Sequence, residues 1–117
     1  MSRLIYISGP VDSFNNHPYE RQRDVHRNIQ AIRHVCMQII IHRSEWLPVA
    51  PQCTFYEFLF DKTYKPGLLP NTLELLTRCD AMIVLPGWEI DAQCSKEIRL
   101  MRQLNKPIFN NVSEITK

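Results

Sequence analysis

The chain has little glycine and almost no excess charge of either sign. It holds three glycines in 117 residues, and fourteen Lys and Arg side chains face twelve Asp and Glu side chains, a formal net charge of +2. So small a charge gives no electrostatic reason to expect a nucleic-acid polymer or a membrane surface as partner. No apolar run reaches the roughly 20 residues that a membrane-spanning helix needs, and no signal-peptide pattern opens the chain. We therefore expect a cytoplasmic protein.

Patterns of metal-binding or redox-active residues are also missing. The four cysteines form no Cys-x-x-Cys pair. Three of the four histidines recur every eight residues along one predicted helix, whereas ligating pairs stand three or four apart. Free thiols fit the reducing cytoplasm and are expected to be buried as small apolar side chains. We predict no metal and no other cofactor. The residues concerned are Cys36, Cys53, Cys79, Cys94, His26, His34 and His42.

Short apolar segments alternate with helical patterns along the chain. The length suits a single domain over residues 1–117. Strands that alternate with helices predict a parallel α/β sheet with right-handed crossovers. The predicted strands are residues 4–7, 46–51, 81–85 and 106–109, and the predicted helices are residues 18–42, 55–61, 70–78 and 91–104.

The spacing of the apolar residues and the positions of the prolines indicate how some of these elements pack. In helix 18–42 the apolar residues recur at intervals of three and four, which predicts one stripe that faces the core. Helix 91–104 shows a shorter version of the same pattern. The prolines of segment 46–51 suit an edge strand better than a central one. The residues predicted to point inward are Val25, Ile29, Ile32, Cys36, Ile39 and Ile40, then Leu73 and Leu76, then Cys94, Ile98, Met101 and Leu104.

The segment 79–91 carries the most informative pattern. A buried strand ends there at a Pro-Gly turn, and the helix that follows holds Asp91 at its start and Glu97 in its second turn. Ligands of open parallel sheets bind outside the carboxyl ends of the strands. If Ile7 and Leu85 end adjacent central strands, the loops that follow them meet at one edge, and Glu97 lies close to a bound ligand.

The chemistry of that edge suits a sugar or a phosphate. Helix starts after Asn16 and Asp91 direct free N–H groups towards the same place, and Gly9 lets a ligand approach the backbone closely. A carboxylate beside an anomeric carbon acts as a nucleophile or stabilises an oxocarbenium ion. The alternative is structural: Asp91 caps its helix and Glu97 is a solvated helix residue, since acidic groups favour helix starts.

Several segments follow one another in a familiar order. They are Ile5-Tyr6-Ile7-Ser8-Gly9-Pro10, Cys79-Asp80-Ala81, Leu85-Pro86-Gly87-Trp88-Glu89, Glu97 and Asn105-Lys106-Pro107-Ile108. Together they resemble the nucleoside 2-deoxyribosyltransferase-like family, above all its small members from phages and prophages. The resemblance spans nearly the whole chain. It implies a flavodoxin-like (Rossmann-like) doubly wound parallel sheet of four to five strands in three α/β/α layers, and a homodimer or larger homo-oligomer.

The resemblance also implies an activity. Members of this family break or transfer the N-glycosidic bond of a (deoxy)nucleoside or its 5′-monophosphate without a metal or other cofactor. Glu97 stands where the family has its nucleophile, Asp91 where a residue contacts the ribose, and Tyr6 where a tyrosine orients the nucleophile by a hydrogen bond. The candidate substrate-binding residues are Ser8, Gly9, Pro10, Asp80, Gly87, Trp88 and Gln93.

The chain departs from the family at two positions. Gln93 replaces a usual glycine, and Thr72, next to Asn71, replaces an acidic residue. Neither Thr nor Asn titrates near neutral pH, so neither supplies general acid catalysis, which is usually worth about 10²–10⁴-fold in rate. The alternative function is therefore a catalytically weakened protein of the same fold that binds or sequesters a nucleotide.

Two of the candidate residues have a structural alternative. Asp80 is expected to bond backbone groups at the start of its strand. Trp88 either stacks on a base or covers the core.

Overall fold

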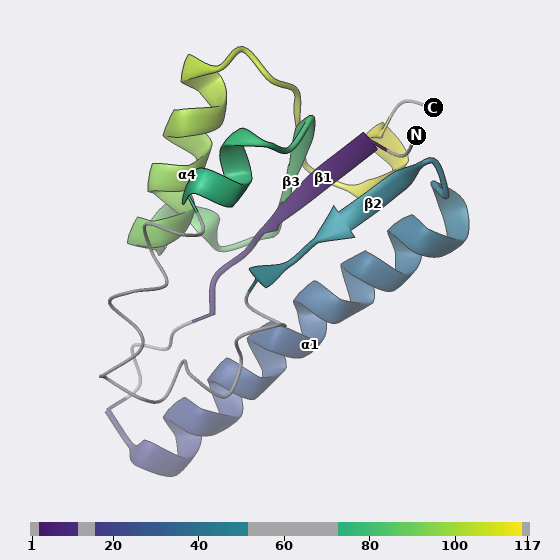
Figure 1. Ribbon diagram of the computed structural model, residues 1–117. Helices are drawn as coiled ribbons and strands as arrows, with labels where there is room; N and C mark the ends of the chain where they lie inside the picture. The colour runs from purple at the N-terminus through teal and green to yellow at the C-terminus, as the bar shows by residue number, and fades with distance from the viewer. Residues whose placement is uncertain (1–2, 12–15, 52–72, 116–117) are drawn as a thin grey trace.

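The computed structural model describes residues 3–11, 16–51 and 73–115 (Figure 1). The helix predicted at residues 55–61 lies outside these ranges, as do Cys53, Asn71 and Thr72. The strands are β1 (Arg3–Ser8), β2 (Trp46–Val49), β3 (Ala81–Val84) and β4 (Ile108–Phe109), and the α-helices with both ends described are α1 (Pro18–His42) and α4 (Ala92–Gln103). Residues 73–77 are helical, and two short 3-10 helices, η2 (Trp88–Ile90) and η3 (Val112–Glu114), flank α4 and β4.

The described strands form one parallel sheet. Their order is β2-β1-β3-β4, and each neighbouring pair runs parallel. This is the strand order of a doubly wound sheet of the flavodoxin-like kind, in which the second strand of the chain lies at the edge, beside the first. The predicted α/β doubly wound fold is confirmed. β2 lies at an edge, as its prolines predicted, and β1 and β3 are the central pair.

Helices cover both faces of the sheet. Successive strand residues point to opposite faces, so Ile5 and Ile7 pack with Ile32 and Ile39 of α1. Tyr6 faces the other way and packs with core residues on the α4 side, which include Leu76, Met82, Ile98 and Met101. Figure 1 shows α1 on one side of the sheet and α4 on the other, so the architecture has three layers.

Two of the residues predicted to point inward are exposed instead. Ile40 is 57% exposed and Leu104 is 40% exposed, so both predictions were wrong. Each residue of an α-helix is rotated by about 100° from the one before it, so Ile39 reaches the core and the adjacent Ile40 does not. Leu104 lies one residue beyond the end of α4. Several strands are also shorter than predicted, as β2 ends at Val49.

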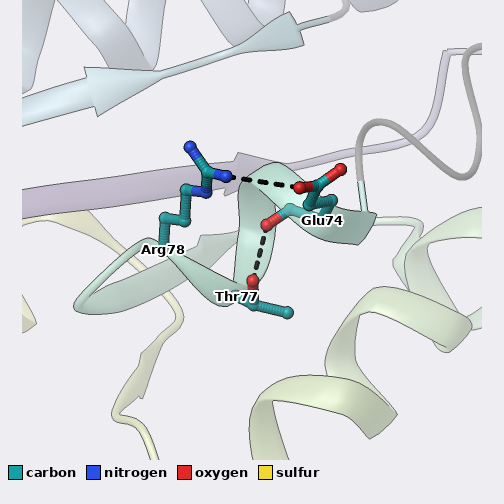
Figure 2. Close-up of polar contacts among 3 residues, drawn as sticks. All are labelled: Glu74, Thr77 and Arg78. Carbon is teal, nitrogen blue, oxygen red and sulfur yellow. Dashed lines mark hydrogen bonds and ion pairs between the residues drawn. The ribbon is translucent and has the colours of Figure 1, made fainter.

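Polar contacts secure the connection from residues 73–77 into β3. The Thr77 hydroxyl donates to the Glu74 carbonyl at 2.6 Å, and the Arg78 guanidinium lies 3.2 Å from the Glu74 carboxylate (Figure 2). Both partners of this ion pair are largely exposed, and such pairs contribute little to stability. The Lys106 ammonium donates to the carbonyls of Thr77 and Cys79, each at 2.6 Å, and so ties the loop before β4 to this connection.

The described cysteines behave as buried or half-buried apolar side chains. Cys79 and Cys94 are buried, Cys36 is half-buried, and all three are free thiols. Burial raises the pKa of Cys79 to about 11, which keeps the thiol protonated near neutral pH. Within residues 3–11, 16–51 and 73–115, no helix is both long and apolar enough to cross a membrane.

Candidate functional site

The candidate site lies where the two central strands end. Ser8 of β1 is in register with Val84 of β3, and the chain leaves these strands towards opposite faces of the sheet, into α1 and α4. Such a switch point is the usual binding place in doubly wound sheets. Gly87 adopts a φ of +94°, which favours glycine. A Cβ atom there would lie 3.3 Å from the Pro10 ring, so the loops after β1 and β3 meet.

A buried carboxylate forms the centre of this site. Glu97 is only 1% exposed, which excludes the alternative of a solvated helix residue. The Tyr6 hydroxyl donates to Glu97 Oε2 at 2.5 Å, the Ser8 hydroxyl donates to Oε1 at 2.8 Å, and the Gln93 amide donates to Oε2 at 3.2 Å. Short O–H···O⁻ distances of about 2.5–2.7 Å are typical of hydrogen bonds to an ionised acceptor.

Two elementary periodicities bring these donors together. Tyr6 and Ser8 stand two apart in β1, so both side chains point to the α4 side of the sheet. Gln93 and Glu97 stand four apart in α4, so they are neighbours on one face of that helix. Asp91 begins α4, and its carboxylate accepts the Cys94 backbone N–H at 3.0 Å. Asp91 therefore caps the helix, as the structural alternative expected.

Burial dominates the electrostatics of Glu97. Loss of solvation raises the pKa of the Glu97 carboxyl, and the nearby Asp91 carboxylate raises it further, whereas the hydrogen bonds from Tyr6, Ser8 and Gln93 lower it. Among the described residues, no Lys, Arg or His side chain forms an ion pair with Glu97. The charge of the ionised form is therefore held by three neutral donors.

The groups next to Glu97 keep their protons. Burial and the Glu97 carboxylate raise the pKa of Tyr6, so the phenol remains a hydrogen-bond donor. The Cys94 thiol is 1% exposed, and burial raises its pKa as well. In the described part of the chain, no group of three His, Cys, Asp or Glu side chains is placed to hold a metal ion. The site thus offers the Glu97 carboxylate among protonated donors, with the Asp91 carboxylate nearby.

One of three comparisons with known proteins gives a match, and it spans all the site residues described above. The family described as Domain of unknown function (DUF7768) matches residues 3–111. The chain belongs to the DUF7768 family. The comparisons with curated proteins and with solved structures gave no match. The matched residues run from β1 to just beyond β4, so Tyr6, Ser8, Gln93 and Glu97 all lie within the DUF7768 domain.

The structure brings some of the predicted site residues together and separates others. Tyr6, Ser8, Asp91, Gln93 and Glu97 of the DUF7768 domain share one end of the sheet, and the contact between Tyr6 and Glu97 that the resemblance implied is present. Their catalytic roles stay predictions. Sequence reasoning missed that Ser8 and Gln93 bind Glu97, although the i+2 and i+4 spacings were visible signals.

The remaining predicted residues make mainly structural contacts. Gly9 is buried, and a Cβ atom there would lie 3.2 Å from Leu85 and 3.4 Å from Ile32. The lack of a side chain at Gly9 therefore makes room for these two core residues. Trp88 is half-buried and packs on the α4-side core that contains Tyr6. Asp80 precedes β3 at the opposite end of the sheet, where its carboxylate accepts the Leu4 N–H at 2.8 Å. Asp80 is therefore separate from the Glu97 cluster.

The Asp80 contact leads to a stability prediction for the DUF7768 domain. Replacing Asp80 with Ala leaves the Leu4 N–H without its acceptor at the start of β1. We expect the free energy of unfolding, measured by urea denaturation, to fall by about 1 kcal/mol, the usual net worth of such a bond. An unchanged urea midpoint for Asp80→Ala, with Glu89→Ala as an exposed control, would contradict this role.

The Ser8 contact leads to a prediction about ionisation. The Ser8 hydroxyl donates to Glu97 and favours the charged carboxylate, so Ser8→Ala is expected to raise the pKa of Glu97 further. The measurement is the pH dependence of the Glu97 carboxyl ¹³C shift, which requires no substrate. Ser44→Ala is the matched control, because Ser44 is an exposed residue of the α1–β2 turn. A titration midpoint that stays the same or falls in Ser8→Ala would contradict the proposed electrostatics.

Proposed function

We propose that this domain cleaves or transfers the N-glycosidic bond of a (deoxy)nucleoside or nucleoside 5′-monophosphate, with Glu97 as the nucleophile. The observation that carries the proposal is the buried Glu97 carboxylate, which three neutral donors hold at the switch point of the sheet. The resemblance to nucleoside 2-deoxyribosyltransferase-like proteins supports the same function. It further supports a homodimer or larger homo-oligomer, and the free thiols support a cytoplasmic location.

The electrostatics of Glu97 favour this chemistry over simple binding. Cleavage of an N-glycosidic bond builds positive charge on the sugar, in an oxocarbenium-like transition state. A carboxylate that no cation among the described residues neutralises attracts that charge far more strongly than it attracts the neutral sugar of the ground state. Burial increases the difference, because the attraction is less screened in a medium of low dielectric constant.

The neighbouring residues have complementary roles in the proposal. Tyr6 and Ser8 hold the carboxylate in a fixed orientation by direct hydrogen bonds. A fixed reacting group lowers the entropy cost of reaching the transition state. Asp91, at the start of the same helix, would accept hydrogen bonds from ribose hydroxyls. The base leaves with the bonding electrons, and the sugar passes to water or to a second base.

A second candidate function is nucleotide binding or sequestration without turnover. Gln93 favours it, because the amide occupies the side of Glu97 where the resembling family usually has glycine, and the carboxylate is 1% exposed. Thr72, at the usual position of an acidic residue, favours it as well. In this case the fold would keep the site but lack efficient catalysis.

One assay separates the two functions. The purified protein is incubated with a panel of deoxynucleosides, ribonucleosides and their 5′-monophosphates, and free base is followed by chromatography. Release of base above the uncatalysed rate supports the enzyme. Saturable binding by calorimetry, without base release for any member of the panel, supports the second function and contradicts the first. A protein that neither binds nor cleaves any member of the panel would contradict both functions.

A further inference from the structure

The two oxygens of the Glu97 carboxylate have different surroundings. Oε2 accepts two hydrogen bonds, from the Tyr6 hydroxyl at 2.5 Å and from the Gln93 amide at 3.2 Å. Oε1 accepts one among the described residues, from the Ser8 hydroxyl at 2.8 Å. These two oxygens are the atoms that could attack the sugar in the proposed reaction, so their different surroundings can decide which of them reacts.

Lone pairs turn this asymmetry into a chemical difference. An ionised carboxylate has about four lone-pair sites, two on each oxygen. The two donors on Oε2 match the number of its lone-pair sites, whereas Oε1 has one donor, Ser8, for two sites. A nucleophile attacks through a lone pair that points at the electrophilic carbon. Only Oε1 keeps such a lone pair with respect to the described donors.

We propose that Oε1 of Glu97 is the oxygen that bonds to the anomeric carbon, and that Gln93 is a positioning residue that sets this choice. The inference rests on the proposed function. An Oε1 lone pair forms the bond to C1′ while the C1′–N bond breaks, and its electron pair leaves with the base, which takes a proton from water. In the second step a water oxygen attacks C1′, the C1′–Oε1 bond breaks, and the released proton passes to solvent.

Gln93 is the residue that makes the two oxygens unequal. With Tyr6 and Ser8 alone, each oxygen would accept one hydrogen bond and keep one free lone pair. The amide of Gln93 reaches Oε2 from one helical turn earlier, because residues four apart face each other on a helix. The glycine usual at this position in the resembling family has no side chain to do so. The departure from that family is therefore part of the mechanism in this chain.

The deciding experiment is a crystal structure of the trapped intermediate. The protein is soaked with the 2′-fluoro-arabino analogue of the nucleoside that releases base fastest, since the fluorine slows breakdown of the glycosyl ester. We expect an ester through the oxygen that faces Ser8, while the oxygen that faces Tyr6 and Gln93 remains the carbonyl. An ester through the other oxygen overturns this inference but leaves the proposed function intact. Absence of both base release and adduct overturns the two together.

Kinetics of one variant test the role of Gln93 without a structure. Gln93→Met keeps the length of the side chain and removes the donor. We expect kcat to fall about tenfold, the scale of one hydrogen bond to a charged group, with KM little changed. The acid limb of the pH–rate profile should move to higher pH, because the Gln93 hydrogen bond lowers the pKa of Glu97. Gln103→Met, at an exposed position of α4, is the control. An unchanged kcat and acid limb in Gln93→Met would overturn the role.

Discussion

Replacing Glu97 with Gln is expected to lower the rate of base release by at least about 10³-fold, because the amide cannot act as the nucleophile. The side chain keeps its size and its carbonyl can still accept the hydrogen bond from Tyr6. The fold should therefore persist, and the loss is chemical. Glu74→Gln removes the same charge from an exposed helix position and is expected to leave the rate unchanged. Equal rates for wild type and Glu97→Gln would contradict the nucleophilic role.

The same substitution has a second, independent consequence for stability. Burial raises the pKa of Glu97 above its ordinary value of 4.5. At pH values between the pKa of Glu97 in the unfolded chain and its higher pKa in the folded chain, the folded chain binds more protons. The contribution of Glu97 to stability therefore falls as the pH rises through that window. Glu97→Gln removes the titrating group, so the variant does not undergo this loss of stability as the pH rises. We expect the stability of the variant, relative to wild type, to increase from pH 4 to neutral pH.

Urea denaturation at several pH values measures this difference. The wild type and Glu97→Gln are compared at each pH, and Glu74→Gln controls for the general effect of losing one negative charge. A stability difference between wild type and Glu97→Gln that does not change with pH would contradict a raised pKa at Glu97. Gains of stability on removing a functional group are common, since active sites favour function over stability.

The second large effect is expected in the core on the other face of the sheet. Ile39→Ala is expected to lower the free energy of unfolding by about 2–5 kcal/mol, the usual cost of truncating a buried Ile. Ile39 is fully buried between α1 and the sheet. The neighbouring Ile40 is 57% exposed, so Ile40→Ala should change stability by less than about 0.5 kcal/mol, as most surface substitutions do.

This pair of variants tests the rotation of α1. Both substitutions remove the same atoms from adjacent positions of one helix, so differences in helix propensity cancel. Urea denaturation with a common slope for the two variants gives the comparison. Similar losses for Ile39→Ala and Ile40→Ala would contradict the packing described for this face of the sheet.

Much of the architecture could be predicted from local patterns. The intervals of three and four in residues 18–42 predicted α1 and three of its buried isoleucines, because helical period and burial leave a direct trace in the order of residues. The prolines around Val49 predicted an edge strand for the same kind of reason, since a missing N–H excludes a central position. The failure at Ile40 has the same origin: three consecutive isoleucines cannot all face one side of a helix.

The candidate site could be predicted only in part. The resemblance singled out Glu97 and Tyr6 and implied their contact, and both lie at the switch point of the sheet. Gly9 was expected to face a ligand, yet it packs against Leu85 and Ile32. Such contacts depend on neighbours that are 20 to 80 positions away in the chain, and no local pattern specifies them.

The amino-acid sequence by itself determined the alternation of strands and helices, the parallel sheet and the start of α4 at an acidic cap, because these features follow from local periodicity and backbone chemistry. Only the tertiary structure decided that Ser8 and Gln93 share the Glu97 carboxylate and that Asp80 lies at the opposite end. The physical reason is that a hydrogen bond forms between atoms about 3 Å apart, and that distance between β1 and α4 exists only once both have packed against each other in the folded chain.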